Sequence, residues 1–285
     1  MRFEIMGGDE RLRELALLLS DEGHEVLCFA MDKAELPENI RKVERPENAD
    51  CVILPLPAES GRLGTLNAPF SSLSYSASRL LSSLDRDSLV CAGKLSPRLR
   101  GAASEGGIRL CDYMTRPEFT VGNAAITAEA AVSRCMSETA YTVFGSRVLV
   151  IGWGRIGKLT AIKLSALGAS VTVLSRNPEA RALAAAMGFG EASPETGCDA
   201  LTDFDIVINT APAPVLSEAQ LRAVRPDCFV LELASAPGGI DADTAEKCGF
   251  RYAVAPGLPG RYAPRSAAKL IRDAVMNIVK EHENV

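Results

Sequence analysis

The chain has 285 residues, of which 47% are hydrophobic and 24% are charged, and its formal net charge is −5. A chain of this length and composition can bury the cores of two ordinary domains. Nucleic acids and anionic membranes require clustered cations, and the sequence contains no long run of Lys or Arg. We therefore expect a folded protein that acts on small molecules, with neither nucleic acid nor membrane as a partner.

No apolar stretch approaches the roughly 18 to 20 residues of a membrane span, and the N-terminus lacks the profile of a signal peptide, so we expect a cytoplasmic protein. The cysteines occur singly, without a C-x-x-C pair, and only two histidines, His24 and His282, accompany them. This pattern favours reduced and mostly buried thiols and gives no indication of a metal site. The eight cysteines are Cys28, Cys51, Cys91, Cys111, Cys135, Cys198, Cys228 and Cys248.

In the first half of the chain, short apolar runs alternate with helical patterns, as they do in the βα units of a parallel sheet. The clearest helix is DERLRELALLLSDEG, in which Leu12, Leu15 and Leu19 recur at helical spacing. Asp9, at its start, either caps this helix or faces a ligand. The expected strands are residues 2–7, 25–30, 51–57, 88–93 and 107–113.

The same alternation returns after a long helical segment, AITAEAAVSRCMSETA. The second set of expected strands is residues 147–152, 170–175, 206–210, 229–234 and 251–256. We predict an α/β protein with two Rossmann-like, doubly wound parallel-sheet domains and a cleft between them. The expected boundaries are an N-terminal substrate or partner domain (1–124), a connecting helix (125–144), a cofactor domain (145–263) and a terminal helix (264–282) that packs back on the first domain.

A glycine-rich turn separates the first strand of the second half from the helix that follows it. The stretch VLVIGWGRIGKLT contains Gly152, Gly154 and Gly157 in the spacing G-x-G-x-x-G, with Arg155 and Ile156 between the last two glycines. In dinucleotide-binding folds the first glycine permits the turn, the second lets pyrophosphate approach the backbone, and the third packs helix on strand. The strand, turn, helix and second strand that this motif requires are all present. We therefore predict a dinucleotide site.

The second strand of this unit ends without the acid that NAD-binding domains use. A carboxylate at that point accepts hydrogen bonds from the adenosine ribose and repels a 2′-phosphate. Here the sequence reads Ser175, Arg176 and Asn177. A guanidinium between two small polar side chains suits a 2′-phosphate, so NADP is favoured and NAD stays an alternative. The simpler reading is an exposed arginine on a loop.

Three further strand ends are expected around the cofactor, because ligands of open parallel sheets bind beyond the carboxyl ends of the strands. Each of these segments could instead be only a sharp turn. The candidates are Asn209, Thr210 and Ala211 after one strand, Ser235 in the loop SAPGG, and Gly257 in the loop PGLPG.

Several stretches together resemble the A subunits of dipicolinate synthases from spore-forming bacteria. These stretches are GGDERLRELA, NAAITAEAAV, GSRVLVIGWGRIGKLTAIKLSALGASVTV, LELASAPGG and APGLPGRYAPRSAA. The resemblance covers nearly the whole chain in order. Single pieces are shared with other two-domain dehydrogenases, such as the 2-hydroxyacid dehydrogenases and adenosylhomocysteinase.

The resemblance implies oxidation of a dihydrodipicolinate-level intermediate to dipicolinate (pyridine-2,6-dicarboxylate) with NAD(P), in the mother-cell cytoplasm during sporulation. It also implies a flavoprotein-like B subunit of dipicolinate synthase as partner, and it leaves a homo-oligomer open. A dicarboxylate requires cationic donors, for which the candidates are Lys94, Arg98, Arg155, Arg261 and Arg265. Of these we favour Lys94 and Arg261, with Glu129 as a proton acceptor. Surface charges are the simpler reading of each.

Two alternatives remain open. A 2-hydroxyacid dehydrogenase relies on a histidine base in its cofactor half, and this chain has no histidine between His24 and His282. A non-catalytic NAD(P)-binding regulatory or scaffold subunit is compatible with the sequence, because no acid–base pair stands out.

Overall fold

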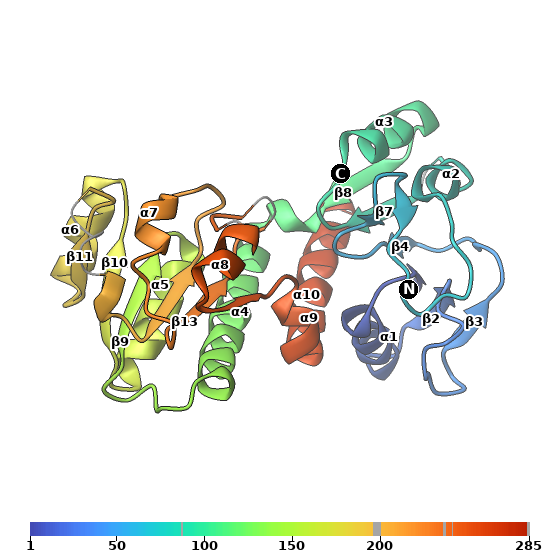
Figure 1. Cartoon of the computed structure of the whole chain (residues 1–285). Coiled ribbons are helices and arrows are strands. Elements are labelled where there is room, and N and C mark those ends of the chain that lie inside the picture. The colour runs from blue at the N-terminus through green and yellow to red at the C-terminus, as the bar shows by residue number, and fades with distance from the viewer. Residues whose placement is uncertain (87, 196–200, 236–237, 241, 284–285) are drawn as a thin grey trace. The chain divides into compact units, whose positions relative to one another are not determined.

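The computed structural model describes residues 1–86, 88–195, 201–235, 238–240 and 242–283, and the chain divides into two compact units. Unit 1 comprises Met1–Asn123 together with Pro259–Val285, and unit 2 comprises Ala124–Leu258. Each unit contains its own six-stranded parallel sheet (Figure 1). The expected fold class of two Rossmann-like parallel-sheet domains is therefore confirmed.

The sheet of unit 1 has the strand order β3-β2-β1-β4-β7-β8, in which the chain runs outward from β1 in both directions. The central strands are buried on both faces and consist mostly of apolar residues, with Glu4 as an exception. The strands are β1 (Arg2–Met6), β2 (Glu25–Phe29), β3 (Arg41–Val43), β4 (Cys51–Ile53), β7 (Leu89–Ala92) and β8 (Arg109–Asp112).

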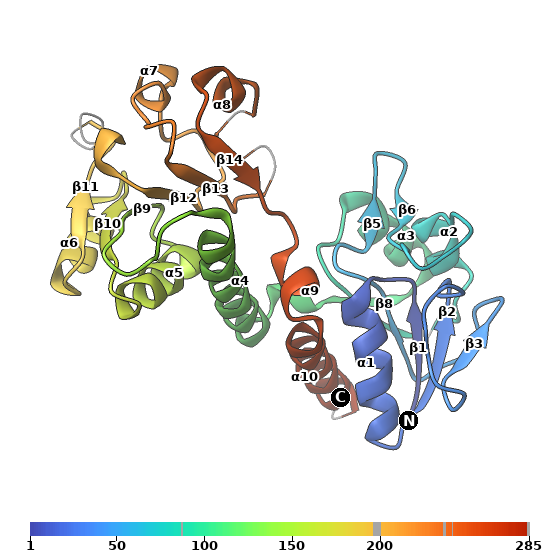
Figure 2. The same cartoon turned by 60° about the horizontal axis from the view of Figure 1, so that its bottom comes forward.

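Helices cover both faces of this sheet (Figure 2). Phe3 and Ile5 face a core built with α1 (Glu10–Asp21) and α10 (Pro264–Glu283), which run side by side. On the other face, Met6 packs in the core of α2 (Ala77–Ser82) and α3 (Pro97–Gly106). The C-terminal helix is thus part of the core of unit 1.

The sheet of unit 2 repeats the same topology, in the order β11-β10-β9-β12-β13-β14. Its strands are β9 (Arg147–Ile151), β10 (Ser170–Leu174), β11 (Gly190–Ala192), β12 (Ile206–Asn209), β13 (Phe229–Glu232) and β14 (Arg251–Val254). One face packs against α4 (Pro117–Glu138), α5 (Arg155–Ala166) and α6 (Pro178–Ala186). The other face packs against α7 (Glu218–Leu221) and α8 (Ala242–Cys248).

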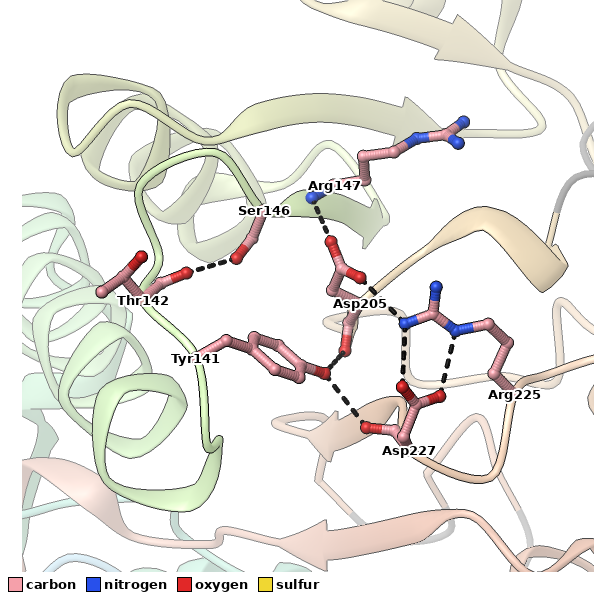
Figure 3. Close-up of polar contacts among 7 residues, drawn as sticks. All are labelled: Tyr141, Thr142, Ser146, Arg147, Asp205, Arg225 and Asp227. Carbon is pink, nitrogen blue, oxygen red and sulfur yellow. Dashed lines mark hydrogen bonds and ion pairs between the residues drawn. The ribbon is translucent and has the colours of Figure 1, made fainter.

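A polar cluster fixes the amino ends of three strands of unit 2 (Figure 3). The Asp205 carboxylate accepts hydrogen bonds from the Arg147 backbone N–H at 2.7 Å and from Arg225 Nη2 at 2.9 Å. The Tyr141 hydroxyl lies 3.0 Å from the carbonyl oxygens of both Asp205 and Asp227. Since ligands bind at the opposite edge of such sheets, we assign this cluster a structural role.

Several sequence-based boundaries differ from the structure. The connecting helix, expected over 125–144, is α4 and begins at Pro117 and ends at Glu138. The short edge strands β3 and β11 were not expected, nor was the hairpin of β5 (Glu59–Ser60) and β6 (Thr65–Leu66). The last three residues of the expected PGLPG loop instead begin α9 (Leu258–Tyr262).

The seven cysteines within the described residues are free thiols, and five of them are buried; Cys198 lies outside the described residues. Burial raises the pKa of Cys28, Cys135 and Cys228 to about 12, so these thiols stay protonated at neutral pH. Among the described residues, no helix has both the length and the apolar character needed to cross a bilayer.

Glu4 is a buried acid in the central strand of unit 1. Burial raises the pKa of its carboxyl to about 7, against the opposing effect of the Glu47 backbone N–H, which lies 3.3 Å away. Because the pKa of the folded state exceeds that of the unfolded state, this group's contribution to stability is complete at low pH and is lost as the pH rises through 7.

We expect Glu4→Gln to remove this loss and to raise the free energy of unfolding at pH 8 by on the order of 1–3 kcal/mol. Amide hydrogen exchange of β1, followed from pH 5 to pH 8, measures the effect. An unchanged pH dependence in the variant would contradict the assignment.

Candidate functional site

The carboxyl edge of the unit 2 sheet begins with a tight turn at Gly152, directly after β9. Gly152 has φ +96°, and an added Cβ would lie 2.6 Å from Thr210 Oγ1. Thr210 closes the turn from β12, because its backbone N–H and its hydroxyl donate to the Ile151 carbonyl oxygen at 2.9 and 2.8 Å. Glycine is therefore required at 152 both by the backbone conformation and by the close approach of Thr210.

The other two glycines of the motif have different surroundings. An added Cβ at Gly157 would overlap the Gly152 carbonyl oxygen, so this glycine lets α5 pack tightly on the turn. Gly154, by contrast, has an ordinary φ of −77°, and an added Cβ would meet no atom within 4 Å. Nothing in the described fold demands a glycine at 154, and the space beside it is open.

The first turn of α5 faces this open space without a side-chain cap. Gly154 is the N-cap residue of α5 and provides no side-chain hydrogen bond. The N–H groups at the start of a helix have no partners within the helix, and together with the helix dipole they attract anions. Arg155 is exposed there, whereas the Ile156 side chain packs against the core of unit 2. This arrangement fits a pyrophosphate.

A pocket of about 420 Å³ continues from this turn across the ends of β9, β10 and β12. The described residues that line it include one cation and no acid. Among the described residues, no carboxylate forms an ion pair with this cation, the exposed Arg176. The lining residues are Gly152, Leu174, Ser175, Arg176, Asn177, Ala211 and Val215.

The two polar neighbours of Arg176 shape the loop itself. Ser175 Oγ accepts a hydrogen bond from the Asn177 N–H at 3.2 Å, and Asn177 Oδ1 caps α6 by accepting from the Glu179 N–H at 2.9 Å. Arg181 Nη1 donates to the Ser175 carbonyl oxygen at 2.8 Å. These contacts tie the loop to the start of α6, and Arg176 is exposed between the two polar residues.

The end of β13 is held by a buried carboxylate that the sequence patterns did not indicate. Glu232 is 2% exposed, and both of its oxygens lie 2.8 Å from Nδ2 of Asn209, the last residue of β12. The same carboxylate accepts hydrogen bonds from the N–H groups of Ala234, Gly239 and Ile240 at 2.8, 3.0 and 3.1 Å. Glu232 therefore joins two strand ends and folds the loop that follows β13.

This contact gives Asn209 a structural partner and places the exposed Ser235 on a loop anchored at both sides. Ala236 and Pro237, in the middle of that loop, lie outside the described residues. The only signal in the sequence for Glu232 is an acid at the end of an otherwise apolar strand, FVLE.

The remaining predicted residues do not lie in this pocket. Gly257 is exposed with φ +66° and is not part of the pocket lining. Glu129, on α4, has a side chain that is 60% exposed, and its carboxylate lies 3.8 Å from Lys163 Nζ on α5. Lys94 and Arg261 are exposed residues of unit 1. The catalytic roles of Lys94, Glu129 and Arg261 stay predictions.

Unit 1 has the same topology, but its corresponding turn is closed. An added Cβ at Gly7 would lie 2.9 Å from the Ala68 side chain, and the Gly8 N–H donates to the Asn67 carbonyl oxygen at 2.8 Å. The Asp9 carboxylate caps α1 and forms an ion pair with Arg11 at 2.8 Å. The helix cap is one of the two roles that the sequence predicted for Asp9. A carboxylate in this position would repel phosphate, so the geometry of a dinucleotide site belongs to unit 2 alone among the described residues.

Comparisons with known proteins match the two halves of the chain to two different families. Residues 2–114 match the family described as the N-terminal domain of the dipicolinate synthase A subunit, and residues 122–236 match "D-isomer specific 2-hydroxyacid dehydrogenase, NAD binding domain". The chain is 29% identical over 290 residues to the A subunit of dipicolinate synthase from Bacillus subtilis strain 168, covering 99% of this chain and 96% of that protein.

Two crystal structures of such proteins have the same fold. The structure of the dipicolinate synthase A subunit from Bacillus halodurans matches with a TM-score of 0.88 and 29% identity, over 98% of this chain and 97% of that one. The A chain of the Bacillus subtilis synthase matches with a TM-score of 0.86 and 28% identity, over 100% of this chain and 97% of that one.

Proposed function

The chain belongs to the family of dipicolinate synthase A subunits, and its cofactor half is an NAD-binding dehydrogenase domain; from this premise we propose that it oxidises a dihydrodipicolinate-level intermediate to dipicolinate with NADP. The observation that carries the proposal is the open space beside Gly154, next to the uncapped first turn of α5. The fold does not use this space, and an anion such as pyrophosphate fits it.

NADP is proposed over NAD because of the charges in the pocket. Of the described residues that line it, Arg176 is the only charged one, and none is an acid. The carboxylate that would select the ribose hydroxyls of NAD is therefore missing, and a guanidinium stands where a 2′-phosphate would accept its hydrogen bonds.

We expect Arg176→Ala to weaken binding of NADP by about 1–3 kcal/mol, roughly five- to 150-fold, while leaving NAD affinity nearly unchanged. Emission from Trp153, the single tryptophan of the chain, gives the readout because this residue lies within the glycine motif. Lys247→Ala is a matched control, since it removes one exposed cation from α8 of the same unit. An equal loss of affinity for both cofactors would contradict the assignment.

The proposed reaction places modest demands on the protein. A bound nicotinamide ring would supply the hydride acceptor, and removal of a hydride and a proton from the substrate would make the substrate ring aromatic. The chain must bind the dicarboxylate through cations, orient the ring carbon that loses hydride, and take up one proton. Lys94 and Arg261 remain our candidates for binding the carboxylates and Glu129 for accepting the proton.

The 2-hydroxyacid dehydrogenase alternative is disfavoured by the placement of the histidines. The His24 ring lies edge-on to Phe3, with the ring centroids 5.1 Å apart, and His282 Nε2 lies 3.5 Å from Cys111 Sγ. Both histidines belong to unit 1, and unit 2 contains none. A histidine base in the cofactor half is therefore not available to this chain.

The test of the proposal is formation of dipicolinate, followed by its ultraviolet absorbance, with substrate generated in situ and with NADP or NAD. We propose that the partner is a flavoprotein-like B subunit, in the mother cell of a sporulating bacterium, so the chain is assayed alone and together with that protein. Dipicolinate formed by the chain alone would establish it as the dehydrogenase. Absence of dipicolinate in both assays, with cofactor still bound, would overturn the proposal in favour of a non-catalytic cofactor-binding role.

A further inference from the structure

Unit 1 contains a pocket of about 460 Å³ that is separate from the cofactor turn. It lies at the carboxyl ends of β4 and β7, between the β5–β6 hairpin and the N-terminus of α3, and is lined by residues within 57–64 and 94–98. Its charged residues are Arg62, Lys94, Arg98 and Glu59, which give an excess of positive charge. Among the described residues, no carboxylate forms an ion pair with Arg62 or Lys94.

The backbone at Lys94 is held in a conformation that a lysine rarely adopts. Lys94 has φ +55°, in the left-handed region, two residues after the end of β7. Its neighbours are fixed on both sides: the Ala58 N–H donates to the Gly93 carbonyl oxygen at 2.9 Å, and the Leu95 N–H donates to the Asp112 carboxylate at 3.3 Å. Strain of this kind clusters at ligand sites, where the surrounding structure imposes it.

Unlike the side chains of Arg62 and Lys94, that of Arg98 forms hydrogen bonds within the described part of the fold. Its guanidinium donates to the carbonyl oxygens of Leu63 and Arg62, and so ties the hairpin to α3. It also lies beside Gly64, where an added Cβ would come within 2.5 Å of Arg98 Nη1 and 2.6 Å of Glu59 Oε1. The absence of a side chain at Gly64 thus lets the guanidinium and the carboxylate approach the same point.

Glu59 carries an oxygen whose hydrogen-bonding capacity is not used by the fold. Glu59 Oε1 is buried and accepts no hydrogen bond from any described residue. Buried carboxylate oxygens are almost always hydrogen-bonded, because an unpaired one costs free energy. A ligand with a hydroxyl or N–H group would donate a hydrogen bond to Glu59 Oε1. A carboxylate on the same ligand would accept hydrogen bonds from Arg62 and Lys94.

We infer that this pocket binds the dicarboxylate substrate: Arg62 and Lys94 hold a carboxylate, and Glu59 Oε1 accepts a hydrogen bond from a hydroxyl or N–H on the same ligand. The identity of the ligand as a dicarboxylate rests on the proposed function. Pyridine-2,6-dicarboxylate has no such donor in its dianionic form, so Glu59 disfavours the aromatic product relative to a hydroxylated or reduced precursor. The pocket therefore favours release of the product.

Two probes test this inference without turnover. Pyridine-2,6-dicarboxylate and 4-hydroxypyridine-2,6-dicarboxylate differ by one hydroxyl group, and calorimetry of the full chain without cofactor gives both affinities. We expect the hydroxylated probe to bind about ten-fold more tightly, as one hydrogen bond to a charged group predicts. We expect Arg62→Gln and Lys94→Gln each to weaken both probes by about ten-fold and to preserve their ratio.

Glu59→Ala should bring the ratio of the two affinities close to one. The variant lacks the carboxylate that accepts a hydrogen bond from the hydroxylated probe and that disfavours pyridine-2,6-dicarboxylate. Lys269→Gln is the matched control, since it removes an exposed cation of unit 1 that does not line the pocket. Circular dichroism establishes that each variant is folded. Absence of binding by wild type, or variant affinities equal to those of Lys269→Gln, would overturn the inference.

The outcome separates this inference from the proposed function. The chain could form dipicolinate with NADP while Arg62→Gln and Lys94→Gln leave the affinities for both probes unchanged. In that case the proposed reaction would stand and the assignment of this pocket would be wrong. If both probes bind as expected but the chain forms no dipicolinate, the assignment of the pocket would stand and the proposed reaction would be wrong.

Discussion

Replacing Gly154 with valine is expected to weaken binding of the nicotinamide cofactor by roughly a hundredfold or more while changing stability by about 1 kcal/mol or less. The reason is that Gly154 has an ordinary backbone conformation and an added side chain meets no protein atom within 4 Å. A valine side chain would occupy the space through which pyrophosphate approaches the first turn of α5. Titration of Trp153 emission with NADP and NAD measures the loss.

A matched control is available in unit 1. Gly101, within α3, also has no neighbour within 4 Å of an added Cβ, but it lies far from any glycine motif in the sequence. Gly101→Val should leave cofactor affinity at the wild-type value. Unchanged cofactor affinity in Gly154→Val would show that the cofactor does not use this turn, and the assignment of the site would be wrong.

Replacing Glu232 with alanine is expected to lower the free energy of unfolding of unit 2 by about 3 kcal/mol or more. The substitution removes the acceptor of the Gly239 and Ile240 N–H groups and leaves these buried donors without partners, and it leaves Asn209 Nδ2 with the Ala211 carbonyl oxygen as its acceptor. Urea unfolding followed by Trp153 emission reports on unit 2 alone, because the chain has no other tryptophan.

Glu246→Ala, which removes an exposed acid on α8, is the control and should change stability by no more than about 0.5 kcal/mol. Glu232→Gln retains one acceptor oxygen and should fall between the two. A Glu232→Ala variant as stable as Glu246→Ala would mean that the loop after β13 does not depend on this carboxylate.

The parallel sheets could be predicted from the sequence because their central strands are buried on both faces. RVLVI and IVIN are apolar at nearly every position, and only a buried strand or helix tolerates such a run. The edge strands β3 and β11 read RKV and GEA, which carry no apolar pattern. Their pairing is imposed by β2 and β10, and no local property of these three-residue segments reveals it.

The tight glycine turn after β9 could be predicted for a related reason: its requirements are local. Gly152 and Gly157 are needed by contacts within the motif and with Thr210, so their spacing is a recognisable pattern. Glu232 escaped prediction because its partners are Asn209, which is distant in sequence, and N–H groups of a later loop. The closed turn in unit 1 was not predicted for the same reason, since Asn67, which accepts the Gly8 hydrogen bond, comes from a separate segment of the chain.

The central claim, that this chain is the oxidoreductase which forms dipicolinate, is tested most directly by following the hydride. The purified chain is given NADP and a dihydrodipicolinate-level substrate deuterated at its ring carbons, and the reduced cofactor is analysed by mass spectrometry. We expect dipicolinate and singly deuterated reduced cofactor in equal amounts, and much slower formation of both by Gly154→Val at the same cofactor concentration. Dipicolinate that forms without deuterium in the cofactor, or at the same rate in Gly154→Val, would contradict the claim.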